Sequence, residues 1–193
     1  MPLRKRGSKR RPTADGGVQR TPLSPVENAI RWLGGRRRFE REVSRHLRGA
    51  GYERAACEEA VARLKELGLL DDAETCRAFL RDRVRFAPKG RAILLAELLR
   101  KGAEGPVAEA ALEEALPAEA EADVATDWLR RSLPRWRNLP EGIARRRMWS
   151  ALARRGFPRD AARAALVRVA GEQLEDRESL SEDNGASVAP EEP

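Results

Sequence analysis

Apolar residues recur every three or four positions in short stretches of this chain, and glycine or proline separates one stretch from the next. This spacing predicts amphipathic helices, because residues three and four apart share one helix face. Ser24 and Glu27 form a capping box pattern at the start of the first stretch. The helices predicted before Gly68 cover residues 25–33, 37–48 and 53–67, which together make one small three-helix unit.

The same plan returns twice further along the chain. One helix follows Asp71 and Asp72, a second ends at Gly102, and a third begins at Pro106. The last group of helices is predicted over residues 119–133, 141–155 and 158–169. Ala, Leu, Arg and Glu dominate these segments, and runs of β-branched residues typical of strands are absent.

Three glycines set the register of the repeat. Superposing Gly51, Gly102 and Gly156 aligns the groups at spacings of 51 and 54 residues, with a leucine four residues before each glycine. An Ala followed by an apolar residue stands nine and ten residues after each one. The sequence therefore predicts an all-α, elongated tandem array of three three-helix repeats over residues 23–68, 69–117 and 118–171.

Charge is distributed unevenly along the chain, which carries +7 in total. Residues 1–20 carry +6 and residues 172–193 carry −7, which leaves +8 for the part between them. Both ends have too few apolar residues for a core, so we predict a disordered basic arm over 1–22 and a disordered acidic tail over 172–193. The basic middle predicts a polyanionic or acidic partner, either nucleic acid or an acidic protein surface.

Histidine and cysteine, which serve in many catalytic and metal sites, are scarce in this chain. His46 is the single histidine, and Cys57 and Cys76 stand 19 residues apart, which matches no common metal site. Asp71 and Asp72 directly precede a helix, where capping explains a carboxylate better than acid–base chemistry does. A Gly-rich phosphate loop is also absent. We therefore predict no catalytic, cofactor-binding or metal site, and a protein that is not an enzyme.

The two cysteines lie at apolar helical positions, which predicts buried, reduced thiols and a reducing compartment. No apolar run approaches the roughly 20 residues of a membrane span. The basic N-terminus also lacks the apolar segment of a signal peptide. We expect a cytoplasmic monomer that makes no use of a membrane.

Arginine and lysine gather on predicted helix faces. Arg77, Arg81 and Arg85 recur every fourth residue, which places them in one stripe along a helix. Trp136, between two arginines, is a candidate for stacking on a base or a partner. The other residues of the predicted partner-binding or DNA-binding set, with an electrostatic role, are Lys89, Arg91, Lys101, Arg145, Arg147, Arg154 and Arg155.

Several short motifs occur in a fixed order in the second and third repeats. They are Gly68, Leu70 and Asp72 in a turn; Phe79, Arg81 and Arg83 in a basic helix; Lys89-Gly90; Leu98, Lys101 and Gly102 at a helix end; and Leu152-Ala153-Arg154-Arg155-Gly156-Phe157. Over about Val26 to Ala170, this order resembles the RecX family of bacterial RecA regulators. One departure is Pro88, which precedes Lys89-Gly90, whereas the family often has the proline after the glycine.

The resemblance implies a cytoplasmic modulator that binds RecA, lodges in the groove of the RecA–DNA filament and suppresses ATPase and strand exchange in recombination and SOS repair. An elongated basic array is compatible with that role. The alternative is a sequence-tolerant DNA-binding protein with helix-turn-helix-like units that binds single- and double-stranded DNA without RecA. A steep dependence of DNA affinity on salt would identify such a phosphate binder.

Overall fold

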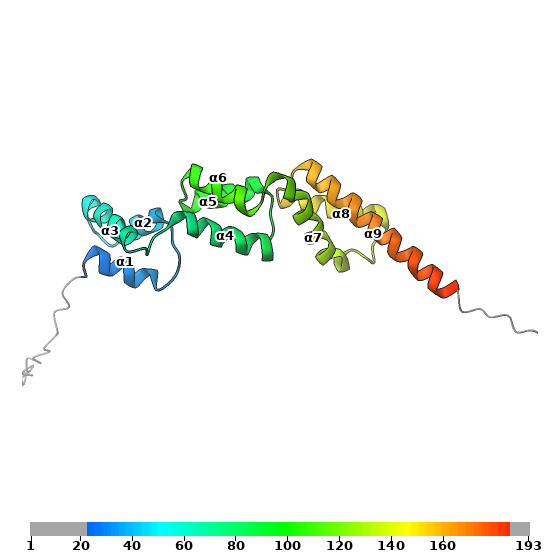
Figure 1. The fold of residues 1–193 in the computed structure, drawn as a ribbon, viewed down its shortest axis with the longest axis horizontal. Helices are drawn as coiled ribbons and strands as arrows, with labels where there is room; N and C mark the ends of the chain where they lie inside the picture. Colours follow the sequence, from blue (N-terminus) through cyan, green and yellow to red (C-terminus); the bar gives the residue numbers. More distant parts are fainter. Residues whose placement is uncertain (1–22, 186–193) are drawn as a thin grey trace, which may run out of the picture.

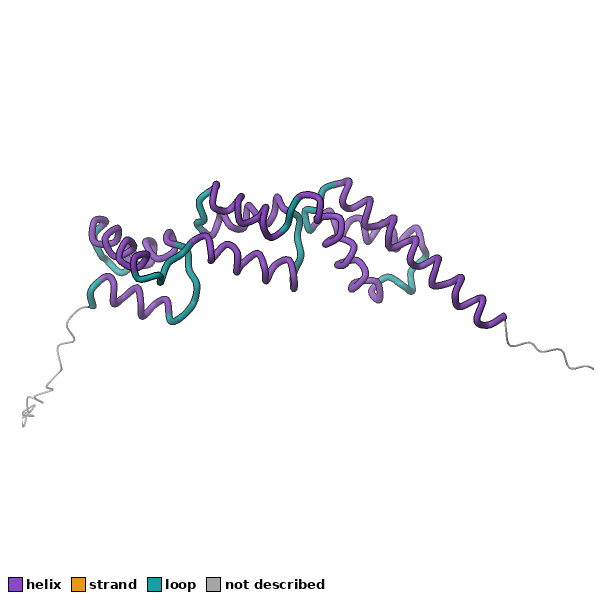
Figure 2. The backbone as a smooth tube through the Cα atoms, in the orientation of Figure 1, coloured by secondary structure: helices purple, strands orange, loops and turns teal. Residues whose placement is uncertain are grey.

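The computed structural model describes residues 23–185, with side chains through Glu172, as an elongated row of helices (Figure 1, Figure 2). The described residues form nine α-helices and two 3₁₀ turns and contain no strand. Three hydrophobic cores follow one another along the row. This confirms the predicted all-α tandem array. The predicted basic arm and residues 186–193 of the predicted acidic tail lie outside the described residues.

The first unit consists of α1 (Pro25–Leu33), α2 (Glu40–Gly49) and α3 (Arg54–Glu66). The predicted capping box forms at α1. The Ser24 hydroxyl accepts the Glu27 N–H at 3.2 Å, and the Glu27 carboxylate accepts the Ser24 N–H at 2.9 Å. Helix α2 begins at Glu40 rather than near residue 37, because Phe39 is extended and its ring is buried in the core of the second unit.

The second unit consists of α4 (Asp72–Phe86), α5 (Arg91–Lys101) and α6 (Gly105–Ala115). Both α4 and α5 pack against α6. The core between them contains Leu80, Leu94 and Leu98, which are fully buried. Asp71 caps α4 by accepting the Glu74 N–H at 2.9 Å. Asp71 is therefore a helix cap, as its position in the sequence predicted.

The third unit contains η1 (Ala118–Ala120), α7 (Glu121–Ser132), η2 (Leu133–Arg135), α8 (Glu141–Arg154) and α9 (Arg159–Gly185). Helix α7 lies along α9, which forms the end of the row in Figure 1. The structure differs from the prediction over residues 172–185, which were assigned to a disordered tail and belong to α9. Their low apolar content suggested disorder. They are also largely good helix formers, and extending an existing helix avoids the cost of nucleating one.

The second helix of each unit ends at one of the three glycines that define the repeat. Gly51, Gly102 and Gly156 adopt positive φ angles of 92°, 118° and 74°. The N–H of the following residue then reaches back to a leucine carbonyl at 3.2, 3.1 and 3.3 Å, respectively. This is the six-to-one hydrogen bond of a Schellman motif. The three accepting leucines are fully buried, so the glycine register predicted from the sequence is the register of the fold.

Neighbouring units interlock where the first meets the second. Leu70, which follows α3, is buried in the first core, whereas Phe39 is buried in the second. The Asp72 carboxylate accepts the N–H of Glu40 at 2.9 Å, so the first residue of α4 caps α2 of the preceding unit. Burial raises the pKa of the Asp72 carboxyl group. Asp72 therefore connects two units through a helix N-terminus.

The joint between the second and third units repeats this arrangement. Glu121, the first residue of α7, is buried, and its carboxylate accepts the N–H of Arg91 at 2.7 Å, so that it caps α5. The Gly90 N–H donates to the Arg155 carbonyl at 2.9 Å. A Cβ atom at Gly90 would lie 1.9 Å from the carbonyl oxygen of Gly156, so the two backbones meet where no side chain fits. At both joints, a carboxylate from the first helix of one unit caps the N-terminus of the second helix of the preceding unit.

Candidate partner-binding surface

The predicted arginine stripe lies on the outer face of α4. Arg81 and Arg85 are exposed and Arg77 is half-buried, and all three follow the four-residue spacing seen in the sequence. Residues from two other segments join them. We define the α4 ridge as Arg37, Arg77, Arg81, Arg85, Phe86 and Arg131.

A single carboxylate organises the first half of the α4 ridge. Glu74 forms ion pairs with Arg77 at 3.0 Å, with Arg81 at 3.6 Å and with Arg37, from the loop before α2, at 3.6 Å. The hydrogen bond from Arg77, with added attraction from the other two arginines, lowers the pKa of Glu74. One negative charge therefore positions three positive ones, and the group keeps a net charge of about +2 at neutral pH.

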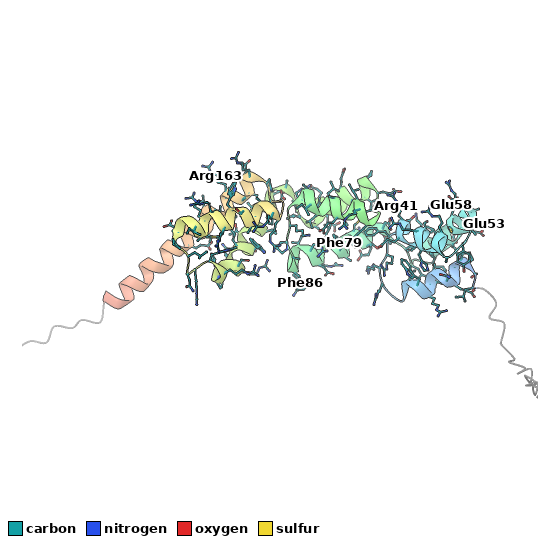
Figure 3. The ribbon with its side chains drawn as sticks, turned by 180° about the vertical axis from the view of Figure 1, so that it is seen from behind. Arg41, Glu53, Glu58, Phe79, Phe86 and Arg163 are labelled. Carbon is teal, nitrogen blue, oxygen red and sulfur yellow. The ribbon has the colours of Figure 1, made fainter. Side chains whose placement is uncertain are left out.

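The second half of the α4 ridge combines charge with an exposed aromatic ring. Phe86 is 71% exposed, and the Arg85 guanidinium lies 5.0 Å from the centre of its ring. Figure 3 shows Phe86 projecting from the end of α4. Arg131 of α7 donates to the Arg85 carbonyl at 3.2 Å and, with Val84 and Val124, lines a shallow hollow of about 390 Å³. This end of the ridge therefore offers both apolar and cationic contacts.

Two residues of the predicted set, Lys89 and Arg91, have partners inside the protein. Lys89 pairs with Glu97, a carboxylate whose side chain is only 13% exposed. The Arg91 guanidinium donates to the Leu116 carbonyl and to Glu113, the latter at 2.6 Å. The structure therefore separates these two residues from the α4 ridge and gives each a role in holding the second unit together.

Lys101 also faces inward. Its ammonium lies 5.5 Å from the centre of the Phe79 ring, and the Arg83 guanidinium lies 5.0 Å from the same ring. These cation–π contacts join α4 to the end of α5. Lys101 is half-buried and does not lie on the α4 ridge.

Arg155 belongs to the joint between the second and third units. Its guanidinium donates to the Pro88 carbonyl at 3.0 Å and lies 4.2 Å from the centre of the Trp128 ring. Burial lowers the pKa of Arg155. Pro88 is itself buried, so the turn that departs from the family pattern is fixed by contact with the third unit.

The remaining predicted arginines lie on α8 and are exposed. Arg147 and Arg154 line a hollow of about 620 Å³ together with Trp136 and Ile143, and Arg145 lines a different hollow beside α9. Trp136 packs edge-on against Trp128, with their ring centres 6.0 Å apart, and is half-buried against the third core. The third unit thus has a basic surface that is separate from the α4 ridge.

Structural contacts account for the residues that could have suggested chemistry. The His46 ring stacks on the Trp32 ring with their centres 4.3 Å apart, and the His46 Nε2 lies 2.8 Å from the Asn28 side-chain oxygen. Cys57 and Cys76 are buried, and burial raises the pKa of the Cys76 thiol to about 11. Within residues 23–172, whose side chains the structure describes, no three His, Cys, Asp or Glu residues gather as metal ligands would. Likewise, none of the described helices is long and apolar enough to cross a membrane.

Comparison with known proteins identifies the family of this chain. The models of the first and second three-helix domains of RecX match residues 27–64 and 71–112. The Regulatory protein RecX of Streptomyces coelicolor is 31% identical over 166 residues, which cover 84% of this chain and 88% of that protein. The chain belongs to the RecX family. A RecX of a Mycobacterium species (strain JLS) is 35% identical over 149 residues, which cover 75% of this chain and 81% of that one.

Solved RecX structures share the fold. The crystal structure of RecX from Lactobacillus salivarius superposes with a TM-score of 0.66 at 19% identity, and covers 75% of this chain and 93% of its own. A second structure of a regulatory protein RecX gives a TM-score of 0.61 at 21% identity, with 71% and 68% covered. The relatives of this RecX-family chain are named regulatory proteins, in keeping with the absence of a predicted catalytic site.

Sequence reasoning missed the residues that complete the α4 ridge. Arg37 and Arg131 lie far from α4 in the sequence, and no local pattern links either of them to that helix. Glu74 carried a detectable signal, since its spacing from Arg77 and Arg81 places the three on one helix face. No sequence signal marked Phe86 as a surface residue, because an apolar residue at a helix end is usually part of a core.

Proposed function

We propose that this protein is a non-enzymatic regulator that binds RecA and the RecA–DNA filament and lowers ATP hydrolysis and strand exchange in recombination and SOS repair. The observation that carries the proposal is the match to Regulatory protein RecX over 84% of this chain. The α4 ridge is the proposed contact surface. The protein acts as a monomer in the cytoplasm.

The chemistry of the α4 ridge supports an acidic protein surface as the first contact. Three of its five arginines pair with one internal carboxylate, Glu74, so most of the positive charge of the ridge is left for a partner. Phe86 adds an apolar contact in the middle of cationic side chains, and aromatic residues with arginines are the types that contribute most to binding at protein interfaces. Charge then steers the approach, and Phe86 contributes affinity by burial.

The row of units supports binding along a helical filament. Each unit has its own core, and the two joints fix each unit to the next through capping carboxylates. Such an array presents successive surfaces along one direction, which suits a partner made of repeated subunits. The ridge and the α8 arginines would then meet different parts of the filament.

Binding measurements distinguish this proposal from direct DNA binding. We expect the immobilised full chain to retain RecA when DNA is absent. We also expect its affinity for single-stranded and duplex oligonucleotides to change little with salt. A DNA-binding protein that contacts Z phosphates gives log–log salt slopes of about −0.7Z for single strands and −0.9Z for duplex. A steep slope together with no capture of RecA would replace the proposed function with the alternative.

A further inference from the structure

The third unit contains a groove that the α4 ridge does not use. A hollow of about 670 Å³ lies between the η2 segment, α8 and α9, and its wall is largely apolar. A neighbouring hollow of about 360 Å³ is lined by three of the same residues, Arg145, Leu166 and Val167. The two therefore form one continuous depression, named here the α8–α9 groove. Its apolar wall consists of Leu133, Trp136, Leu139, Met148, Trp149, Leu166, Val167 and Val169.

Part of this apolar wall faces solvent. Val167 is 61% exposed, and Leu166 and Trp149 are half-buried. Val169 and Met148, deeper in the groove, are buried against the third core. Covering the exposed part with another apolar surface is favourable in proportion to the apolar area removed from water. The wall therefore suits apolar side chains of a partner better than it suits water.

The edge of the α8–α9 groove is strongly basic. Arg137, Arg145, Arg146 and Arg163 line it, and none of them forms an ion pair with a side chain that the structure describes. Glu141 is the one acid among the lining residues. Figure 3 shows Arg163 projecting outward from α9. By contrast, two other arginines of the unit form ion pairs, Arg130 with Glu172 and Arg168 with Asp123.

We propose that the α8–α9 groove binds an acidic amphipathic helix of a protein partner. Apolar side chains at i, i+3, i+4 and i+7 of such a helix would lie on the groove wall, and its carboxylates would meet the four arginines at the edge. The wall favours a protein segment over nucleic acid, because its aliphatic side chains offer no hydrogen bonds to phosphates or base edges. The proposal concerns a groove that shares no residue with the α4 ridge, and it holds whether or not that ridge contacts RecA.

A designed peptide tests the groove directly. The probe is a fluorescein-labelled peptide of about 18 residues, or five helical turns, with leucines at i, i+3, i+4 and i+7 and glutamates elsewhere. We expect fluorescence anisotropy to show that it binds the full chain. We expect Val167→Glu to weaken binding at least about tenfold, because a charge then lies on the apolar wall. Val167 is exposed, so this variant should keep the wild-type circular dichroism spectrum.

Two controls identify what the probe recognises. Leu99→Glu changes an apolar residue of α5 that is 41% exposed and lies outside the groove, and it should bind the peptide as the wild type does. A peptide of the same composition with scrambled order should bind at least about tenfold more weakly. Absence of peptide binding, equal binding of the scrambled peptide or no effect of Val167→Glu would overturn the proposal. A single-stranded oligonucleotide that binds the wild type but not Val167→Glu would assign the groove to nucleic acid instead.

Discussion

Replacing Gly90 with alanine is expected to lower the free energy of unfolding by about 3 kcal/mol, the cost of forcing an atom into a filled site. The new Cβ would lie 1.9 Å from the Gly156 carbonyl oxygen, so the two backbones must separate. That separation also strains the hydrogen bond from the Gly90 N–H to the Arg155 carbonyl, which spans 2.9 Å. Urea unfolding followed by helical circular dichroism at 222 nm measures the change.

Gly142→Ala is the matched control for this experiment. Gly142 lies in α8, and a Cβ atom there meets no atom within 4 Å. The change should stabilise the protein by about 0.5–1 kcal/mol, because alanine favours a helix over glycine by that amount. Equal urea midpoints for the two variants would show that the close approach of Gly90 and Gly156 does not hold the second and third units together.

Removing the charge of the α4 ridge is expected to weaken inhibition of RecA without unfolding the protein. The variant replaces Arg77, Arg81, Arg85 and Arg131 with alanine. If each of these arginines contributes about 0.5 kcal/mol to binding, the four together contribute about 2 kcal/mol. That corresponds to a rise of about 30-fold in the half-inhibitory concentration for RecA ATP hydrolysis. The circular dichroism spectrum should stay unchanged, because no member of this set is buried.

The control variant removes the same number of charges from other surfaces. Arg31, Arg45, Arg48 and Arg159 are exposed and lie outside α4, so their replacement by alanine should leave inhibition close to that of the wild type. Equal losses for the two variants would mean that total charge, and not the α4 ridge, governs inhibition. Lys89 and Arg91 are left intact in both variants, because their contacts with Glu97 and Leu116 hold the second unit together.

Local patterns in the sequence predicted much of this fold. Helix periodicity depends on neighbouring residues, and the Schellman glycines Gly51, Gly102 and Gly156 show in sequence as a leucine, three residues and a glycine. The capping roles of Ser24 and Asp71 are equally local, since each accepts an N–H three residues away. Such features need no knowledge of how the units meet.

Contacts between units could not be predicted in the same way. Asp72 caps α2 across 32 residues, and Glu121 caps α5 across 30 residues. Nothing in the sequence near either acid indicates which backbone N–H group its carboxylate accepts. For the same reason Arg155 had the pattern of a free surface charge, although Pro88 and Trp128 cover it. A basic residue at a joint and a basic residue at a binding surface look alike in a sequence.

The most direct test of the proposed function is the rate of ATP hydrolysis by RecA on single-stranded DNA, measured with increasing amounts of this protein. We predict that the wild-type chain lowers the rate to a plateau, that the control arginine variant does the same, and that the α4 ridge variant needs a concentration about 30-fold higher. A rate that stays unchanged when the wild-type chain is present in excess over RecA would contradict the proposal that this protein restrains RecA.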